Sequence, residues 1–203
     1  MREIKNVLET EKYKYYIHAG IGLYLLGFQG NHQDIDFRVF HPNIKELYLF
    51  LEKQLKTKVS LRRPKNIYHG RYDNHCIEIE DGEFDITTEL VTVREGVRFE
   101  VPFSEEFFSN ITYERYLGIS LPVTSLENIF LYYLIHRRGQ RMGKKDEKDI
   151  LEILESGKLN EKKFKSIVDQ MKAKTELMQL FSYYKNMLVS FAHVNQRKNP
   201  RLG

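Results

Sequence analysis

The sequence contains a single cysteine, Cys76, among its 203 residues. One cysteine cannot form an intramolecular disulfide, which suits a reducing compartment, and we expect Cys76 to be packed in a strand. No apolar run approaches the roughly 20 residues that cross a bilayer. The first residues also lack the apolar stretch of a signal peptide. We therefore expect a cytoplasmic protein that has no membrane partner.

Several other features are missing as well. The chain has no internal repeat, no low-complexity tract and no long Gly/Ser linker. It lacks the Gly-Lys-Ser/Thr sequence that ends a P-loop, and its seven histidines do not form a His-x-x-x-His pair on a helix. These absences exclude a P-loop and a helical zinc site.

The composition predicts a folded domain with a mildly basic surface. Hydrophobic residues make up 41% and aromatic residues 13%, which is enough for a buried core, and the net charge is +4. A sequence pI near 8.9 is compatible with a polyanionic partner such as a nucleotide or RNA. Basic residues crowd one stretch, either as a solvated loop or as a site for triphosphate or RNA; they are Arg137, Arg138, Arg141, Lys144 and Lys145.

The hydrophobic pattern changes along the chain. Residues 1–121 read as short strands and helices, whereas residues 122–203 read as helices, so we expect an α/β domain followed by a helical region packed on it. We place a hairpin at Asp81-Gly82, since Asp-Gly favours a tight turn, and a helix that Pro42 opens. The C-terminal helices are expected from Ser125 onward and at about 145–155, 160–173 and 175–192.

Asp34 and Asp36 lie in a segment with strand-like alternation, Asp-Ile-Asp-Phe-Arg-Val-Phe. Residues two apart on a strand point to the same side, so the two carboxylates should face one way. The alternatives for such a pair are a solvated strand end and a site for a hard divalent cation, because Mg²⁺ is held by one or two carboxylates plus substrate phosphates. Asp85 is a third lone carboxylate in an apolar frame, between Phe84 and Ile86. If its strand lies beside the first, the three acids could hold two metal ions.

Gly20-Ile21-Gly22 lies where a predicted strand passes into a short helix. Glycines allow the backbone to approach a phosphate, and the free N–H groups at a helix start attract anions. Such a Gly-x-Gly is more often only a turn, so the glycines gain weight only in combination with the acids.

This combination resembles the nucleotidyltransferase superfamily typified by DNA polymerase β, in particular its small, minimal prokaryotic members. The family pattern of an apolar residue and Gly, followed by Asp-h-Asp-h, reads here as Ala19-Gly20-Ile21 and then Asp34-Ile35-Asp36-Phe37, and the third family acid falls on Asp85. Residues 121–129 are similar to a helix-opening segment of these proteins, and Lys145-Asp146 with Asp149-Ile150 is similar to their Lys-Asp-x-x-Asp-Ile element.

The resemblance implies an α/β (α+β) fold with a small mixed sheet, flanking helices and a C-terminal helical region. It implies that Asp34, Asp36 and Asp85 are catalytic and bind Mg²⁺ or Mn²⁺. It further implies that ATP or another NTP is bound by a set of residues comprising Gly20, Ile21, Gly22, His32 and Lys145. We expect Asp146 and Asp149 to cap and solubilise the following helix.

Two functions follow from these motifs. The first is metal-dependent transfer of a nucleoside monophosphate from an NTP to a hydroxyl of RNA, protein or a small molecule, with a regulatory partner protein conceivable. The second is a catalytically weak or inactive module that binds nucleotide or RNA. Ile21 favours the second, because the family has a small residue there, whereas retention of all three acids favours the first. A basic structural protein that binds RNA is a weaker third alternative.

Overall fold

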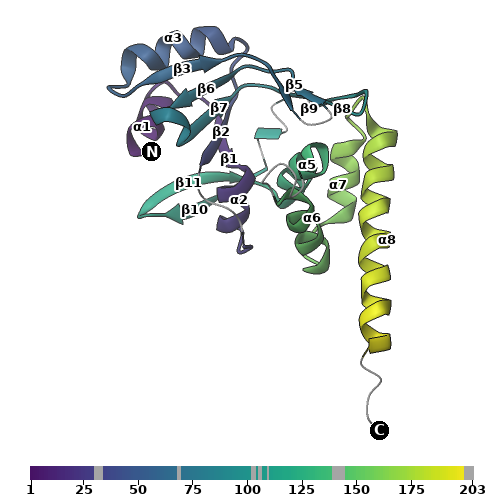
Figure 1. Cartoon of the computed structure of the whole chain (residues 1–203). Helices are drawn as coiled ribbons and strands as arrows, with labels where there is room; N and C mark the ends of the chain where they lie inside the picture. The colour runs from purple at the N-terminus through teal and green to yellow at the C-terminus, as the bar shows by residue number, and fades with distance from the viewer. Residues whose placement is uncertain are drawn as a thin grey trace.

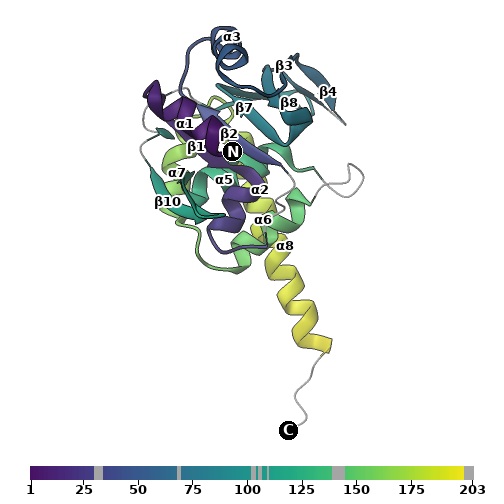
Figure 2. The ribbon, with the colours of Figure 1, turned by 90° about the vertical axis from the view of Figure 1, so that its left-hand side faces the viewer.

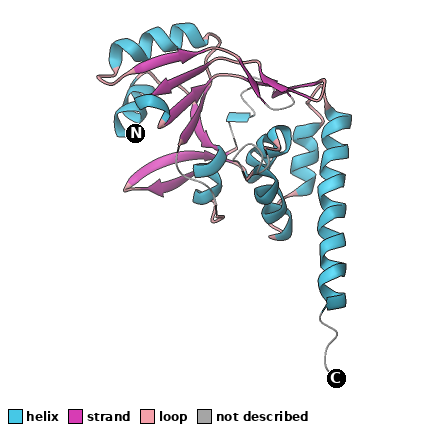
Figure 3. Ribbon diagram, in the orientation of Figure 1, coloured by secondary structure: helices cyan, strands magenta, loops and turns pink. Residues whose placement is uncertain are grey.

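The computed structural model describes residues 1–29, 34–67, 70–101, 104, 107–108, 110–138 and 145–198, the last eight of these by their backbone. Strands gather in the N-terminal part and helices in the C-terminal part (Figure 3). The α/β (α+β) class predicted from the sequence is confirmed: a mixed sheet has flanking helices, and a helical region follows it.

The larger sheet has seven strands in the order β10-β11-β1-β2-β7-β6-β3. Its central pairs, β1 with β11 and β2 with β7, are parallel, and the remaining pairs are antiparallel. The strand bounds, in chain order, are β1 Tyr15–His18, β2 Ile35–Val39, β3 Val59–Arg62, β6 Cys76–Ile79, β7 Phe84–Thr87, β10 Ile111–Tyr116 and β11 Ile119–Thr124.

A smaller antiparallel sheet extends this architecture, in the order β4-β5-β8-β9. Its strands are β4 Lys65–Ile67, β5 Gly70–Tyr72, β8 Leu90–Arg94 and β9 Val97–Val101. The sequence pattern of residues 83–90 predicts one strand, but the chain leaves the large sheet after Thr87 and enters the small one at Leu90. The two sheets therefore meet at this step, and in Figure 1 the small sheet lies beyond β6 and β7, toward the helical part.

The hairpin predicted at Asp81-Gly82 is confirmed, because β6 and β7 pair antiparallel on either side of it. The turn is longer than a two-residue loop and contains a short 3-10 helix, η1 (Glu80–Gly82). Three consecutive residues of this helix, Glu80, Asp81 and Gly82, have positive φ, a conformation that glycine and aspartate tolerate better than most residues.

Helices α1 (Arg2–Thr10), α2 (Ala19–Leu25) and α3 (Ile44–Gln54) accompany the large sheet. Helix α3 begins two residues later than a start at Pro42 would require, because the Asn43 side chain is the cap and accepts hydrogen bonds from the N–H groups of Lys45 and Glu46. The helix then turns Leu47 and Leu51 into the core, where both are fully buried.

The C-terminal region contains α5 (Leu126–His136), α6 (Asp146–Glu155), α7 (Glu161–Val168) and α8 (Lys174–Lys198). Helix α5 is buried on nearly every side and contacts α2, α6, α7 and α8. An aromatic cluster joins three of these helices, with the Phe164 ring 5.1 Å from Phe130 and 5.0 Å from Phe181. Helix α8 leaves the body of the molecule toward the C-terminus in both views (Figures 1 and 2).

One hydrophobic cluster runs through both halves, from Ile4 and Leu8 in α1 to Phe181 and Tyr184 in α8. The boundary we drew between residues 121 and 122 lies within β11, and the first C-terminal helix starts at Leu126. Whether residues 1–121 fold as a separate domain stays a prediction. None of the helices in the described ranges is both long and apolar enough to pass through a membrane.

Candidate functional site

Four neighbouring strands place four polar residues side by side on one face of the large sheet. His18 on β1 pairs with Asp36 on β2, Asp36 pairs with Asp85 on β7, and Asp85 pairs with Glu78 on β6. Directly paired residues project their side chains to the same face, and adjacent strands lie about 4.8 Å apart. The register therefore brings Asp36 and Asp85 next to each other, although 48 residues separate them in the chain.

Asp34 immediately precedes β2 and is two residues from Asp36. The following backbone N–H, that of Ile35, donates a 2.9 Å hydrogen bond to the carbonyl of Glu83, which joins the start of β2 to the turn before β7. Alternation along the strand then directs Asp34 to the same face as Asp36. The three acids expected to converge thus lie at the same end of two parallel strands.

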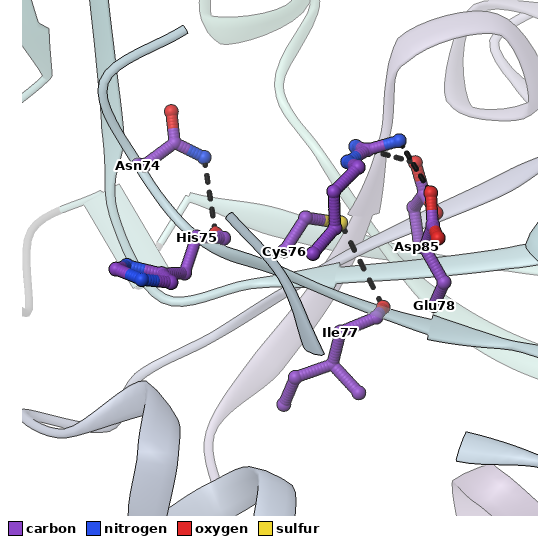
Figure 4. Close-up of polar contacts among 7 residues, drawn as sticks. Asn74, His75, Cys76, Ile77, Glu78 and Asp85 are labelled. Atoms are coloured by element: carbon purple, nitrogen blue, oxygen red, sulfur yellow. Dashed lines mark hydrogen bonds and ion pairs between the residues drawn. The ribbon is translucent and has the colours of Figure 1, made fainter. Parts of the chain in front are cut away.

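A guanidinium group from the next strand contacts this row. Arg62 on β3 lies 2.5 Å from Glu78 and 3.4 Å from Asp85, measured between the charged atoms. Figure 4 shows the Glu78 and Asp85 carboxylates beside each other, with dashed lines to the same guanidinium. Cys76, on the same strand as Glu78, is buried as expected.

Burial raises the pKa of Asp85 above its usual value. The Arg62 guanidinium opposes this rise, and the carboxylates of Glu78 and Asp34 add to it. One carboxylate oxygen, Asp85 Oδ1, is buried and has no hydrogen-bond partner in the described part of the chain. An unsatisfied carboxylate oxygen in a row of acids is a position that a cation or a hydroxyl donor would satisfy.

A cavity of about 350 Å³ opens over this row. The three acids border it together with Gly20 and Lys145, so the structure brings together five of the residues predicted for the site. Arg138, from the basic stretch that the sequence offered as a triphosphate or RNA site, also lines it. Further charged residues of the lining had been assigned no such role or had not been considered: Arg62, Arg63, Lys65, Glu78, Asp146 and Asp149. Within the described residues, no three carboxylate, imidazole or thiol groups already surround a common metal position.

The three residues of the Gly20-Ile21-Gly22 turn differ in whether they reach the cavity. Gly20 borders the cavity near the start of α2, whereas Ile21 and Gly22 are buried. A Cβ on Gly22 would lie 3.1 Å from Ile129 Cδ1, so this glycine allows α2 to pack closely against α5. Ala19, the residue before Gly20, has a φ of +55°, a left-handed conformation that is costly for alanine. Strain of this kind is often found at ligand sites.

The N-terminus of α6 forms another wall of the cavity. The Arg138 side chain binds both carboxylate oxygens of Asp146, at 2.8 Å and 3.3 Å, and the Arg138 backbone N–H donates to the same carboxylate at 2.9 Å. This contact fixes the start of α6 against the end of α5 and leaves Lys145 at the rim. Asp146 and Asp149 are 3% and 7% exposed, so they do not solubilise the helix as we expected.

Aromatic and histidine side chains close the inner side. His18 is buried, and burial together with the Arg38 charge lowers its pKa to about 3, so the ring is neutral at physiological pH. Its ring lies 4.9 Å from that of Tyr132 on α5. Tyr132 and Tyr133, whose helical positions predict either core residues or groove walls, both line the cavity. His32, Arg141 and Lys144 lie outside the described residues.

Comparison with known proteins gives no match at the level of sequence: no protein-family model and no curated protein matches the chain. Solved structures do match. The crystal structure of ANT(2'')-Ia in complex with adenylyl-2''-tobramycin superposes with a TM-score of 0.53 over 88% of this chain and 94% of that chain, at 16% identity. The solution structure of the same antibiotic-resistance factor gives 0.51 over 97% and 95%, at 14% identity. The lincosamide antibiotic adenylyltransferase LnuA gives 0.43 over 74% and 91%, at 19% identity.

The chain therefore has the nucleotidyltransferase fold, as its motifs predicted. The match extends over nearly the whole chain, including the C-terminal helices.

Proposed function

We propose that this protein transfers a nucleoside monophosphate from an NTP to an acceptor hydroxyl in a reaction that depends on a divalent metal ion. The observation that carries the proposal is the strand register that pairs Asp36 with Asp85 directly, with Asp34 at the start of the same strand, under a cavity of about 350 Å³. The nucleotidyltransferase fold supports the same reaction class.

The residues present fit a hard cation. Oxygen ligands suit Mg²⁺, and the unpartnered Oδ1 of Asp85 is a buried acceptor that needs a partner. Asp34, Asp36 and Asp85 would hold the ion, which when bound would neutralise the triphosphate. Because Arg62 already contacts Asp85, we expect the Asp85 side chain to shift between this contact and the metal.

The chain's own groups would do the remaining work. The N–H groups at the start of α2, next to Gly20, would bind phosphate oxygens, and Lys145 at the rim would add a positive charge. Asp85 would accept the proton of the acceptor hydroxyl at a carboxylate oxygen, since its raised pKa makes it a stronger base than an ordinary aspartate. The buried His18 and the half-buried Tyr132 would limit access of water to the inner side.

The test is transfer from NTPs radiolabelled at the α-phosphate, with Mg²⁺ or Mn²⁺ and with RNA and cell extract as sources of acceptor. We expect Asp85→Asn to reduce the transfer rate by at least about 100-fold, the size of a lost general base. The matched control is Asp81→Asn, because Asp81 lies on the turn before the same strand but its side chain is 76% exposed. Equal rates for wild type and Asp85→Asn would refute the assigned role.

A second candidate is a nucleotide-binding module without turnover, which two observations favour. Arg62 already binds Asp85, and among the residues the structure describes no metal cluster is preassembled. Calorimetry that detects Mg²⁺-dependent NTP binding, together with no transfer to any acceptor, would select this function. Chelation of the metal by EDTA should abolish NTP binding in both cases.

A further inference from the structure

We infer that the acceptor in this reaction carries phosphate groups, and that Arg63 and Lys65 bind them. The inference rests on the proposed function and deepens it, because it assigns a chemical class to the second substrate. It depends on how the charged groups divide between the two ends of the cavity.

The order of strands gives the cavity a donor end and an acceptor end. Gly20 and the start of α2 lie beyond β1 on one side of the Asp36–Asp85 pair, whereas Arg62 ends β3 on the other side, with β6 between β3 and β7. The triphosphate is assigned to the glycine end under the proposed function, because Gly20 borders the cavity there and a glycine allows a phosphate to approach the backbone closely. Asp85, the proposed base, faces the opposite end, so the acceptor hydroxyl must enter from the side of β3 and β4.

Nearly all of the carboxylates that line the cavity already have an assigned partner, either the metal ion or an arginine. Asp34, Asp36 and Asp85 are assigned to the metal, and the two remaining ion-paired acids are Glu78, bound by Arg62, and Asp146, bound by Arg138. The last acid in the described lining, Asp149, has its pKa raised to about 6 by burial and by the nearby Asp146 and Glu152. A cationic acceptor such as an aminoglycoside needs carboxylates, and the one acid in the described lining that is neither assigned to the metal nor ion-paired is Asp149, which is 7% exposed and lies on α6 rather than at the acceptor end.

Two of the positively charged side chains at the acceptor end, in contrast to the acids, have no carboxylate partner among the described residues. Arg63 and Lys65 border the cavity, and neither forms an ion pair with any carboxylate in the ranges that the structure describes. Burial lowers the pKa of Lys65 and the neighbouring Arg62 guanidinium lowers it further, whereas the Glu78 and Asp85 carboxylates raise it. The Lys65 ammonium lies 6.0 Å from the centre of the Tyr72 ring, which also lines the cavity.

A phosphate-bearing acceptor satisfies this arrangement. A guanidinium binds two phosphate oxygens at once, and an ammonium adds a point charge. The phosphates could belong to a polynucleotide that ends in a free hydroxyl or to a small phosphorylated molecule, since both present the same group. Arg63 and Lys65 are exposed, so both sources can reach them.

The experiment compares the double variant Arg63→Gln/Lys65→Gln with wild type. The matched control is Lys162→Gln/Lys165→Gln, which removes two positive charges from the exposed side of α7. Binding of a fluorescent single-stranded RNA is measured by anisotropy over a range of salt concentrations. Transfer from labelled NTP is measured with that RNA, with glycerol 3-phosphate and with tobramycin as acceptors.

If the phosphates belong to RNA, loss of two contacts should weaken RNA binding about tenfold at physiological salt and reduce the slope of log affinity against log salt by about 1.4. If they belong to a small molecule, RNA binding should not change, and the KM for glycerol 3-phosphate should rise about tenfold. The control variant should match wild type in both assays. Tobramycin labelled as well as either phosphate-bearing acceptor, with equal rates for wild type and Arg63→Gln/Lys65→Gln, would overturn the inference.

Calorimetry with a non-hydrolysable NTP analogue and Mg²⁺ separates this inference from the proposed function. The Arg63→Gln/Lys65→Gln variant should bind the analogue as wild type does, because its two positions lie at the acceptor end. A wild-type protein that binds no Mg²⁺–NTP would refute the proposed function, whatever the acceptor assays give. A double variant that loses the analogue would refute the acceptor assignment alone, since its side chains would then serve the NTP.

Discussion

Asp149 shows how a single buried side chain sets a pH dependence. It is 7% exposed and lies one helical turn from the buried Asp146. Its pKa of about 6 in the folded chain exceeds the ordinary value of 3.8, so the folded state holds the proton more tightly than the unfolded state. The resulting contribution to stability is fully present below pH 3.8 and is lost as the pH rises through about 6.

We therefore expect Asp149→Asn to raise the free energy of unfolding by about 2 kcal/mol at neutral pH, because the amide carries no charge to desolvate. The difference from wild type should disappear near pH 4. Urea denaturation at several pH values measures it. The control is Glu155→Gln, which changes an exposed carboxylate at the end of the same helix; a pH-independent difference for Asp149→Asn would contradict the assignment.

A second prediction for a single residue concerns the packing of Gly22. In Gly22→Ala the new Cβ meets Ile129 Cδ1 at 3.1 Å, and the overpacking should outweigh the gain in helix propensity, for a net loss of about 1 kcal/mol. In an Ile129→Val background that methyl group is absent, so Gly22→Ala should instead stabilise by about 1 kcal/mol. A double-mutant cycle by urea denaturation gives the coupling. Identical effects in the two backgrounds would show that this contact does not limit the position.

At the scale of elements, the clamp between Arg138 and Asp146 holds α6 against α5. Asp146→Ala leaves a buried guanidinium without its carboxylate, which should cost about 3 kcal/mol of stability. Because Lys145 directly precedes Asp146, the same variant should also weaken NTP binding. Thermal unfolding followed by circular dichroism measures the first effect and calorimetry the second. Glu155→Ala, at the exposed end of α6, should change neither.

The sequence predicted elements well where the signal was local. The alternation around Asp34 and Asp36 and the Phe-Asp-Ile of β7 identified two strands, and the structure shows that these strands pair in parallel, which the sequence alone did not predict. Strand β3 had no comparable signal, and its absence from the prediction meant that Arg62 was not considered for the site. Arg138 was noted in a basic stretch and Asp146 in a family-like element, but the ion pair between them was not predicted, because a local sequence window does not show which charges a fold will bury together.

The whole molecule shares one core, and the contribution of α8 to it is uneven. Leu177, Phe181 and Tyr184 are buried, whereas the described side chains from Lys185 to Ser190 are half-buried or exposed. Figures 1 and 2 show the C-terminal part of α8 extending past its neighbours. Most of the stabilisation by this helix should therefore come from its first three turns.

Val189→Ala, at an exposed position of α8, should leave the free energy of unfolding within about 0.5 kcal/mol of wild type, as for surface changes. Truncation after Glu176 removes Leu177, Phe181 and Tyr184 and should cost at least about 5 kcal/mol, comparable to the stability of a whole domain. Circular dichroism melts distinguish the two. A cooperative, unshifted melt for the shorter chain would contradict a shared core.

The direct pairing of Asp36 with Asp85 has a consequence for how the site can change over generations. Side chains alternate along a strand, so inserting or deleting one residue in β2 before Asp36 would turn its carboxylate to the opposite face, while a change of two residues would restore the face but move the carboxylate along the strand. Substitutions around the acids can accumulate one at a time while the site is kept, whereas a single change in the length of this strand displaces the Asp36 carboxylate from the site. Descendants of this chain should therefore vary freely in the loops that join the strands and keep the length of β2 constant for as long as the site is used.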